Sequence, residues 1–342
     1  MRRIVVVNQK GGCGKTTTAI NLASCLAHQG RRVLLLDLDP QGHAGLGLGL
    51  HTDTVADTIH EVLADDIPIQ QAIVHLRENL DIVPSNVVLS AFEQQMAGVA
   101  QREYVLAQRL LPLRHDYDYL IIDCPPSLGL LTFNALICAD EAIVPVDCSA
   151  FSIQALTKLF ETIALIEEQT GHHLAGGIVP TNIDLRTTFG RDTVATLKHT
   201  FPTQCLPACI RTSTRLREAT MQGKAIIDYD HRCAAAQDYG LLTDEVLKQE
   251  PRRPKKKSRQ KLFTLAAAGN KSVQIAGDFN GWRPEPLRLK DCPEGPLWQK
   301  TVALVPGSYQ YKYLVDGQWL PDPANATTVR NSFGSINSMI TV

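Results

Sequence analysis

The part of the sequence with the clearest chemistry is a glycine-rich segment, residues 8–17, that carries two lysines. It follows an apolar run, residues 4–7, and leads into a segment with helical periodicity, residues 17–29. Glycines let backbone N–H groups close around an anion, and a helix N-terminus adds partial positive charge. We therefore predict a phosphate-binding loop in which Lys15 contacts the β- and γ-phosphates of a nucleotide and the Thr16 hydroxyl ligates Mg²⁺.

Three acidic residues stand where apolar, strand-like runs end. Asp37 comes directly after residues 33–36 and Asp39 follows two residues later, whereas Asp123 comes directly after residues 120–122. Carboxylates at the ends of strands beside a phosphate-binding loop hold the water shell of Mg²⁺ or orient an attacking water. The pattern therefore indicates a site that hydrolyses a nucleoside triphosphate or switches with it.

The elements that must position these residues run from residue 3 to about residue 249. Further apolar runs at residues 142–146 and 177–179 alternate with helical patterns such as residues 153–169. Strands that are apolar on both faces, separated by helices, indicate a mostly parallel sheet with helices on both faces. We predict an α/β domain of the P-loop NTPase type over residues 1–249.

The pattern changes in the last part of the chain, residues 262–342. Short strand-like runs at residues 272–276, 299–304, 309–315 and 337–342 are separated by turn dipeptides such as Asn-Gly, Pro-Gly and Asp-Gly. This predicts an antiparallel β-sandwich with an Ig-like architecture.

All three tryptophans of the chain lie in this last part. Flat indole rings can cover the C–H faces of sugars, whereas core packing is the alternative use of a tryptophan. Trp282 and Trp319 stand beside glycine-containing turns, and for them both uses stay open on the residues alone. Trp298 has strand-like neighbours, which favour the core.

The net charge of −1 conceals a basic segment between the two parts. Residues 252–261 contain seven basic residues and no acid, so that the remaining 27 basic and 35 acidic residues give a charge of −8. With two prolines and almost no apolar residue, residues 250–261 are predicted to be an extended linker. Its charge serves either to keep a spacer solvated or to contact nucleic acid or another polyanion.

Cysteine usage and hydropathy suggest a cytoplasmic protein without a membrane partner. The nine cysteines are an odd number, contain no CxxC pair and fall largely in apolar segments, so we predict neither a disulfide framework nor structural zinc. No apolar stretch reaches the roughly 20 residues of a membrane span, and the N-terminus leads into a strand rather than a signal peptide.

The loop Lys-Gly-Gly-x-Gly-Lys-Thr-Thr closely resembles the deviant P-loop of the ParA/MinD family of partition and positioning ATPases. Gln9 replaces the usual first glycine, and Lys10 matches the extra lysine that reaches the partner's phosphates across a nucleotide-sandwich dimer. The resemblance runs to about residue 247 and implies an ATP-dependent homodimer with ATP and Mg²⁺ as cofactors. It implies a nucleotide-binding loop made of Lys10, Gly11, Gly12, Cys13, Gly14, Lys15, Thr16 and Thr17.

The same resemblance assigns roles to the acids. It makes Asp39 the residue that activates water, so that Lys10, Lys15 and Asp39 form the catalytic set. Asp37 and Asp123 support the metal together with Thr16. The turn after Asp123 resembles a switch that senses the γ-phosphate.

The residues that would recognise the base of the nucleotide are less clearly marked in the sequence. Asn182 is a candidate contact to the base. Arg211 stands where the family has a proline near the base, which is a departure from the family pattern.

Two further segments, residues 179–187 and 210–219, resemble segments that carry DNA-contacting arginines in the chromosome-partition members. By this resemblance Arg186 and Arg215 contribute to non-specific DNA binding, and the alternative is that they are structural surface arginines. The resemblance also implies a partner protein that stimulates hydrolysis.

Residues 270–342 strongly resemble the glycogen-binding domain of the AMP-activated protein kinase β subunit, in carbohydrate-binding module family 48. Phe333 stands where the kinase subunit has a leucine, and Ser335 replaces its threonine. The sugar-contacting positions carried over by this resemblance are Trp282, Lys312, Trp319, Phe333, Ser335 and Asn337.

The leading interpretation is a ParA-type ATPase that positions or segregates a cargo on nucleoid DNA while its C-terminal module binds glycogen or another α-glucan. The protein would then be associated with the nucleoid or with glycogen. One alternative is a glucan-sensing ATPase that controls a metabolic or transcriptional partner. Another is a glucan-binding adaptor with residual ATP binding. A reductase of the nitrogenase iron-protein type is disfavoured, because Cys124 has no companion cysteine to hold a cluster.

Overall fold

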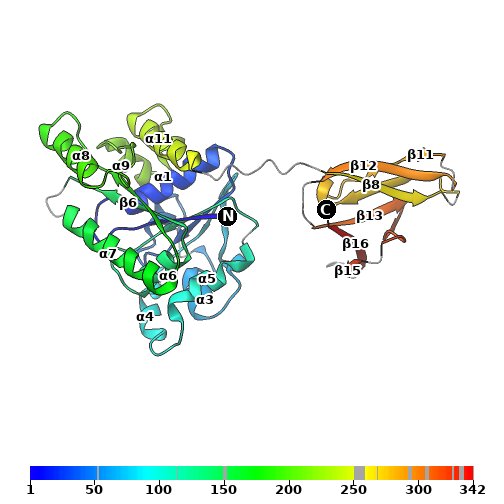
Figure 1. The fold of residues 1–342 in the computed structure, drawn as a ribbon, viewed down its shortest axis with the longest axis horizontal. Helices are drawn as coiled ribbons and strands as arrows, with labels where there is room; N and C mark the ends of the chain where they lie inside the picture. The colour runs from blue at the N-terminus through cyan, green and yellow to red at the C-terminus, as the bar shows by residue number, and fades with distance from the viewer. Residues whose placement is uncertain are drawn as a thin grey trace. The chain divides into compact units, whose positions relative to one another are not determined.

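The computed structural model describes residues 1–51, 54–113, 115–148, 152–249, 259–267, 269–291, 295–304, 308–325, 327–330 and 335–341 (Figure 1). The chain divides into two compact units, Met1–Gln249 and Glu250–Val342. Of the predicted linker, residues 250–258 lie outside the described residues, so the predicted form of that segment stays a prediction, whereas residues 259–261 are not linker but the start of strand β8, Arg259–Ala266.

The larger unit is built on one seven-stranded sheet with the order β3-β4-β2-β5-β1-β6-β7. All neighbouring strands run parallel except β3, which pairs with β4 in the antiparallel sense. This confirms the predicted mostly parallel α/β fold. The strands are β1 Arg2–Val6, β2 Val33–Asp37, β3 Val74–Arg77, β4 Leu80–Val83, β5 Tyr119–Asp123, β6 Glu141–Val146 and β7 Ala175–Pro180.

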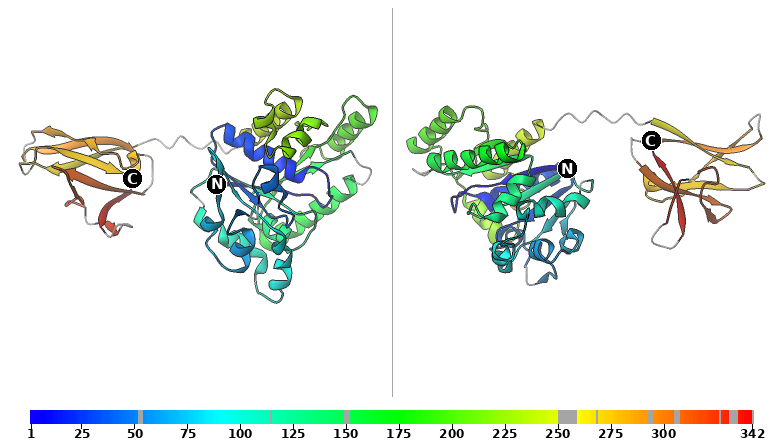
Figure 2. Two further views of the ribbon diagram at one scale, coloured as in Figure 1. Left: turned by 180° about the vertical axis from the view of Figure 1, so that it is seen from behind. Right: turned by 60° about the horizontal axis from the view of Figure 1, so that its bottom comes forward.

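Helices cover both faces of this sheet, as the views in Figures 1 and 2 show. One face is covered by α1 Lys15–His28, α2 His43–Gly47, α9 Thr214–Met221, α10 Ile226–Tyr229 and α11 Ala234–Lys248. The other is covered by α3 Ile59–Ala64, α4 Phe92–Gln95, α5 Val105–Arg109, α6 Leu130–Cys138, α7 Ser152–Thr170 and α8 Thr188–Thr200. Short 3₁₀ turns in the second group are η2 Ile69–Ala72, η3 Val87–Ala91, η4 Arg102–Tyr104 and η5 Leu111–Leu113.

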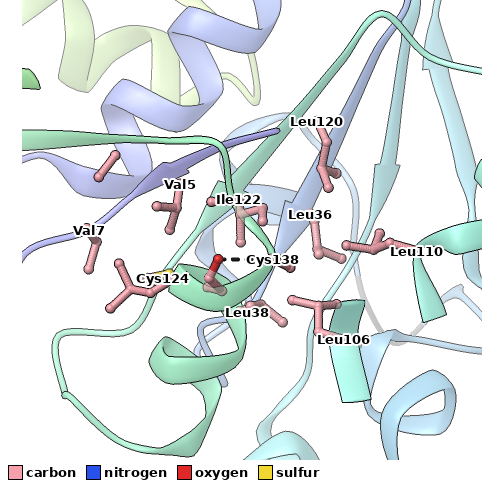
Figure 3. Packing of buried hydrophobic residues seen from close by; sticks show 14 of the residues in the cluster. Val5, Val7, Leu36, Leu38, Leu106, Leu110, Leu120, Ile122, Cys124 and Cys138 are labelled. Carbon is pink, nitrogen blue, oxygen red and sulfur yellow. Dashed lines mark hydrogen bonds between the residues drawn. The ribbon is translucent and has the colours of Figure 1, made fainter. Parts of the chain in front are cut away.

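The central strands are apolar on both sides because both sides are covered. In β1, Ile4 and Val6 pack toward α1 and α11, whereas Val5 packs into the opposite core. Complete burial of each such side chain contributes about 1.5–3 kcal/mol. Figure 3 shows the opposite core, with Val5, Val7, Leu36, Leu38, Leu106, Leu110, Leu120, Ile122, Cys124 and Cys138 labelled. This two-sided packing makes the middle of the sheet a rigid support for the loops at its carboxyl edge.

Cys124 belongs to this core and not to a surface cluster. Its side chain is fully buried beside Val7 in the cluster of Figure 3, and burial raises the pKa of its thiol well above the ordinary value. A buried protonated thiol behaves as a small apolar side chain. Cys124 therefore acts as a packing residue directly after the site carboxylate Asp123.

The smaller unit is an antiparallel β structure, as predicted. One sheet has the order β10-β9-β13-β16-β15, with β14 paired to β13, and the other has the order β11-β12-β8. Phe263, Ile275, Tyr311 and Tyr313 lie in the core, and Trp298 packs half-buried against them. The elements are β8 Arg259–Ala266, β9 Val273–Gly277, η6 Asp278–Asn280, β10 Glu285–Pro286, β11 Arg288–Lys290, β12 Leu297–Leu304, β13 Ser308–Val315, β14 Gln318–Leu320, β15 Thr328–Arg330 and β16 Ile336–Thr341.

Two general features of the described residues bear on the sequence predictions. The eight cysteines among them are all free thiols. None of the helices in these ranges combines the length and the apolar character that a bilayer crossing requires.

Candidate nucleotide site and candidate sugar-binding face

The predicted phosphate loop connects β1 to α1 as the sequence indicated. Gly12 and Gly14 have φ angles of 75° and 90°, in the left-handed region that favours glycine over residues with a Cβ. Gly14 is the N-cap of α1 and brings no side chain to cap the first turn. The amide groups at the start of α1 are therefore suited to an anion supplied from outside the chain.

The two lysines of the loop have different partners. Lys15 is buried, and its Nζ donates a hydrogen bond of 2.9 Å to the carbonyl of Lys10. The Nζ of Lys10 forms an ion pair with Asp147, at 2.7 Å from Oδ1. Lys10, the residue predicted to reach across a dimer, is thus held by a carboxylate of its own chain in this structure.

The acids Asp37 and Asp123 lie side by side, because β2 and β5 are neighbours and pair these two residues directly. Both are 0% exposed. Asp37 accepts hydrogen bonds from the amides of Asp39 at 3.0 Å and Ala44 at 2.9 Å. Neither carboxylate oxygen of Asp123 has a hydrogen-bond partner among the described residues. Two adjacent buried carboxylates repel each other when both are ionised, which disfavours their charged forms.

Burial is the main cause of the shifted pKa values of this pair. It raises the pKa of Asp37 to about 7, with the charge of Asp39 acting in the same direction. Burial and the charge of Asp37 raise the pKa of Asp123 well above its usual range, while the nearby Thr16 hydroxyl and Lys15 ammonium oppose the rise.

These residues fit a hard divalent cation such as Mg²⁺. The cation prefers oxygen donors, and the unpartnered oxygens of Asp123 beside the Thr16 hydroxyl supply such donors. The positive charge would remove the repulsion between the two acids. Asp39, predicted to act on water, is nearly buried, and its Oδ1 accepts from the amide of Gln41 at 3.0 Å. The fold therefore brings together four predicted residues from segments distant in sequence: Thr16, Asp37, Asp39 and Asp123.

A cavity of about 270 Å³ opens beside the phosphate loop. Asn182, the candidate base contact, lies in its lining, and the Thr181 hydroxyl donates a 2.7 Å hydrogen bond to the carbonyl of Cys13. The wall is formed by Gly12, Cys13, Gly14, Thr17, Thr181, Asn182, Ile210, Arg211, Thr212, Ser213, Thr214, Leu216, Arg217 and Tyr239. The cavity therefore adjoins the phosphate loop and includes the candidate base contact, and its volume lies just below the usual range for ligand pockets.

Arg211, the departure from the family pattern, is anchored in this wall. Its guanidinium makes a two-pronged ion pair with Asp238, with Nη2 at 2.7 Å from Oδ1 and Nε at 3.0 Å from Oδ2. Asp238 lies on α11 directly before Tyr239, and Tyr239 also lines the cavity. Our sequence reasoning missed Thr181, Asp238 and Tyr239 as parts of this site, because no motif or spacing in the sequence marks them.

Neither arginine predicted to bind DNA lines this cavity. Arg186 is 91% exposed at its side chain, and both prongs of its guanidinium contact Asp184 at 2.9 and 2.8 Å. Arg215, in the first turn of α9, donates to Glu218 at 3.0 Å. Both arginines are accessible, and both are paired with acids of their own chain.

The smaller unit gathers the predicted sugar-contacting residues on one face of the sheet that contains β9, β13 and β16. Trp282 is 37% exposed and Trp319 is 44% exposed, whereas Lys312 and Asn337 are buried. Trp319 pairs across the hairpin with Leu314, two residues beyond Lys312 and therefore on the same face. The Nζ of Lys312 lies 2.8 Å from the hydroxyl of the exposed Ser335. The remaining predicted contact, Phe333, lies outside the described residues.

This face has the features of a stacking surface. It combines two exposed indoles with buried polar side chains, and in such a combination the rings can cover C–H groups while the polar atoms bind hydroxyls. Our sequence reasoning missed Gln310, whose Oε1 accepts a 2.9 Å hydrogen bond from Nδ2 of Asn337. It also missed Asp278, which contacts the indole N–H of Trp282 at 3.0 Å. For Gln310 the sequence does hold a signal, because a residue two positions from Lys312 in a strand lies on the same face.

The buried acids predict that the metal-free protein loses stability as pH rises. A carboxyl group with a raised pKa in the folded state stabilises the fold below its unfolded pKa, near 4, and this contribution is lost as pH rises through about 7. We expect the melting temperature in EDTA to fall by about 5 °C or more between pH 5 and pH 7, measured by differential scanning calorimetry. Asp123→Asn should reduce the fall, whereas Asp116→Asn, at an exposed acid, should not. An unchanged pH profile in Asp123→Asn would contradict the assignment.

Comparison with known protein families and relatives agrees with both halves of this description. Residues 1–175 match a family described as an AAA domain, and residues 262–342 match the glycogen recognition site of AMP-activated protein kinase. The chain is 40% identical over 245 residues to the sporulation initiation inhibitor protein Soj of Bacillus subtilis, covering 71% of this chain and 97% of that protein. It is 41% identical over 260 residues to the chromosome partitioning protein ParA of Myxococcus xanthus, covering 75% and 92%.

Solved structures resemble the larger unit. A cobyrinic acid a,c-diamide synthase from Mycobacterium smegmatis with bound ADP and magnesium has a TM-score of 0.64 and 34% identity, covering 72% of this chain and 94% of that chain. An ATP complex of a McdA variant from Cyanothece has a TM-score of 0.65 and 26% identity, covering 72% and 96%. With the deviant loop and the buried carboxylates in place, we conclude that the chain belongs to the ParA/Soj family of P-loop ATPases and carries a C-terminal glycogen-recognition domain.

Proposed function

We propose that this protein is a Mg²⁺-dependent ATPase whose ATP-bound homodimer binds DNA without sequence preference, while its C-terminal domain binds glycogen or another α-glucan. The observation that carries the ATPase assignment is the fully buried, unpartnered carboxylate of Asp123 beside Asp37 and the phosphate loop. Such an arrangement is destabilised without a cation and becomes favourable when Mg²⁺ accompanies a bound nucleotide.

The binding of ATP follows from the loop and the cavity next to it. Amides of the loop and the start of α1 face the phosphates, Lys15 adds a charge, and the 270 Å³ cavity receives the base. Thr16, Asp37 and Asp123 would hold the metal, whose charge would neutralise negative charge on the phosphates. The related structures that contain ADP or ATP support the choice of nucleotide.

Hydrolysis requires two events in the chain's own residues. Asp39, held by the amide of Gln41, orients the attacking water and accepts its proton. Lys10 must leave Asp147 to reach the phosphates of a second protomer. The ion pair between Lys10 and Asp147 therefore opposes the dimer in the absence of nucleotide, and the charge of ATP offsets the loss of that pair.

Replacement of Asp39 is expected to trap the ATP-bound dimer. Asp39→Ala should lower ATP turnover by about 100-fold or more, because the general base is lost while the phosphate loop is intact. Gel filtration with Mg-ATP should then show a persistent dimer. Lys15→Ala is the matched control, because it removes a phosphate contact and should abolish nucleotide binding. A monomer of Asp39→Ala in saturating Mg-ATP would refute the role of Asp39.

DNA binding is proposed for the accessible arginines Arg186 and Arg215. The sequence resemblance supports this role. Because the two arginines are paired with Asp184 and Glu218, each guanidinium must leave its acid before it can bind a DNA phosphate. Backbone phosphates bind such guanidinium groups irrespective of sequence. The proposal places the protein on the nucleoid, where a partner protein would stimulate hydrolysis and release it.

Charge reversal tests this DNA contact. Arg186→Glu together with Arg215→Glu should abolish retention on DNA-cellulose in Mg-ATP at low salt. Each single change should reduce the slope of log affinity against log salt by about 1. Arg32→Glu, at an exposed arginine just before the amino end of β2, serves as the control. Equal retention of all variants would exclude these two arginines as contacts.

Glucan binding is proposed for the face around the two exposed tryptophans. Trp282→Ala and Trp319→Ala should each weaken co-sedimentation with glycogen by about tenfold or more, because each removes a stacking ring. Leu289→Ala removes an equally exposed apolar side chain from β11 in the other sheet and should leave pelleting unchanged. If both tryptophan variants co-sediment with glycogen as well as the wild type and Leu289→Ala do, the glucan assignment is wrong.

The two activities in one chain suggest a biological role. A ParA-type ATPase that holds an α-glucan would position or segregate glycogen particles, or place an enzyme that acts on them, along the nucleoid. Nucleotide-controlled dimerisation would then couple attachment to DNA with release from it, while the glucan-binding domain keeps hold of the cargo.

A further inference from the structure

The side chain of Trp282 is held by a carboxylate that is itself bonded to the neighbouring strand. Oδ1 of Asp278 accepts a 3.0 Å hydrogen bond from the indole Nε1 of Trp282. Oδ2 of the same carboxylate accepts a 2.7 Å hydrogen bond from the backbone amide of Gln310 on β13. Asp278 therefore uses both oxygens to connect the indole to the sheet.

The backbone of this turn already fixes where Trp282 begins. Trp282 and the preceding Gly281 have φ angles of 59° and 62°, and a tryptophan in this left-handed region carries a conformational cost. The amide of Trp282 donates to the carbonyl of Gly277 at 3.0 Å, and Asn280 Oδ1 accepts from the amide of Gly277 at 2.9 Å. The turn sets the position of Cα, whereas the bond to Asp278 sets the direction of the ring.

A second contact extends this connection to the other side of the face. Oε1 of Gln310 accepts a 2.9 Å hydrogen bond from Nδ2 of Asn337 on β16. The series Trp282–Asp278–Gln310–Asn337 therefore joins one exposed stacking ring to one buried polar residue of the floor. Its links come from the turn after β9, from β13 and from β16, three segments distant in sequence.

We propose that Asp278 and Gln310 are positioning residues of the glucan-binding face: Asp278 orients the indole of Trp282, and Gln310 orients the amide of Asn337. The inference rests on the proposed glucan binding and adds two residues to it. Neither residue has to touch the sugar for this role. The pair keeps ring and amide in the arrangement that a glucan requires, so that less side-chain freedom is lost on binding.

The alternative use of Asp278 is as a turn former. Aspartate is common in turns because its carboxylate accepts backbone amides nearby in sequence. Here one acceptor oxygen is directed to an indole N–H and the other to an amide 32 residues away. A turn-forming role alone predicts loss of stability without a change in how Trp282 contributes to binding.

A double-mutant cycle in the full chain separates these roles for Asp278. With maltoheptaose as the probe and calorimetric titration as the measurement, Asp278→Ala should weaken binding about fivefold. Asp278→Asn, which keeps one acceptor oxygen, should lie between wild type and Asp278→Ala. In a Trp282→Ala background, Asp278→Ala should have little further effect, because the ring that it orients is gone. Asp291→Ala, at an exposed acid after β11, is the matched control.

The corresponding cycle for Gln310 uses Asn337. Gln310→Leu should weaken binding by several-fold, and Gln310→Glu, which keeps an acceptor for Nδ2 of Asn337, should restore most of it. In an Asn337→Ala background the two Gln310 variants should bind equally. Melting curves of each variant identify any that fail to fold.

The outcomes also distinguish this inference from the function on which it rests. If Trp282→Ala binds maltoheptaose as wild type does, the glucan proposal itself fails. If Trp282→Ala loses binding while Asp278→Ala and Gln310→Leu keep it, glucan binding stands and the positioning roles are wrong. An equal effect of Asp278→Ala with and without the Trp282 ring would likewise overturn the role of Asp278.

Discussion

Two buried carboxylates placed next to each other impose the main constraint on the larger unit. Asp37 and Asp123 end neighbouring strands and are both fully buried, and this burial is the main reason that their pKa values are raised. The sheet is packed on both faces, and this rigid packing keeps the two carboxyl groups side by side although their charged forms repel each other. The phosphate loop and Lys15 lie at the same edge, and a nucleotide with its cation would add further positive charge beside the two acids.

The two domains use preorganisation in different ways. At the nucleotide site the carboxylate oxygens of Asp123 have no hydrogen-bond partner among the described residues, and a bound cation would supply one. At the candidate sugar-binding face the indole of Trp282 and the amide of Asn337 already have hydrogen-bond partners, Asp278 and Gln310, so that the proposed ligand would meet side chains that are already oriented. The difference follows from the ligands. A charged nucleotide brings strong interactions that offset desolvation, whereas a neutral glucan brings weak ones that are easily cancelled by lost side-chain freedom.

Much of the fold and part of the site could be predicted because the signals are local. Buried strands such as β2 and β5 are short apolar runs that can be read from the sequence. The glycine-rich turn before α1 is likewise a local pattern, typical of a loop that surrounds a phosphate. The exposed tryptophans beside their turns were also marked locally. By contrast, β3 and β4 were not predicted, because four residues are too short a pattern and β3, the edge strand, is only half-buried.

By itself, the sequence determined the phosphate loop, the acids at strand ends, the alternation that makes a parallel sheet and the change to antiparallel strands after residue 262. Only the tertiary structure decided that Asp37 faces Asp123, that Lys10 is held by Asp147, that Thr181 and Tyr239 complete the cavity and that Asp278 holds Trp282. The physical reason is that loop conformation and strand formation depend on neighbours along the chain. Pairing between side chains depends on strand order and register, which are set by the packing of the whole domain.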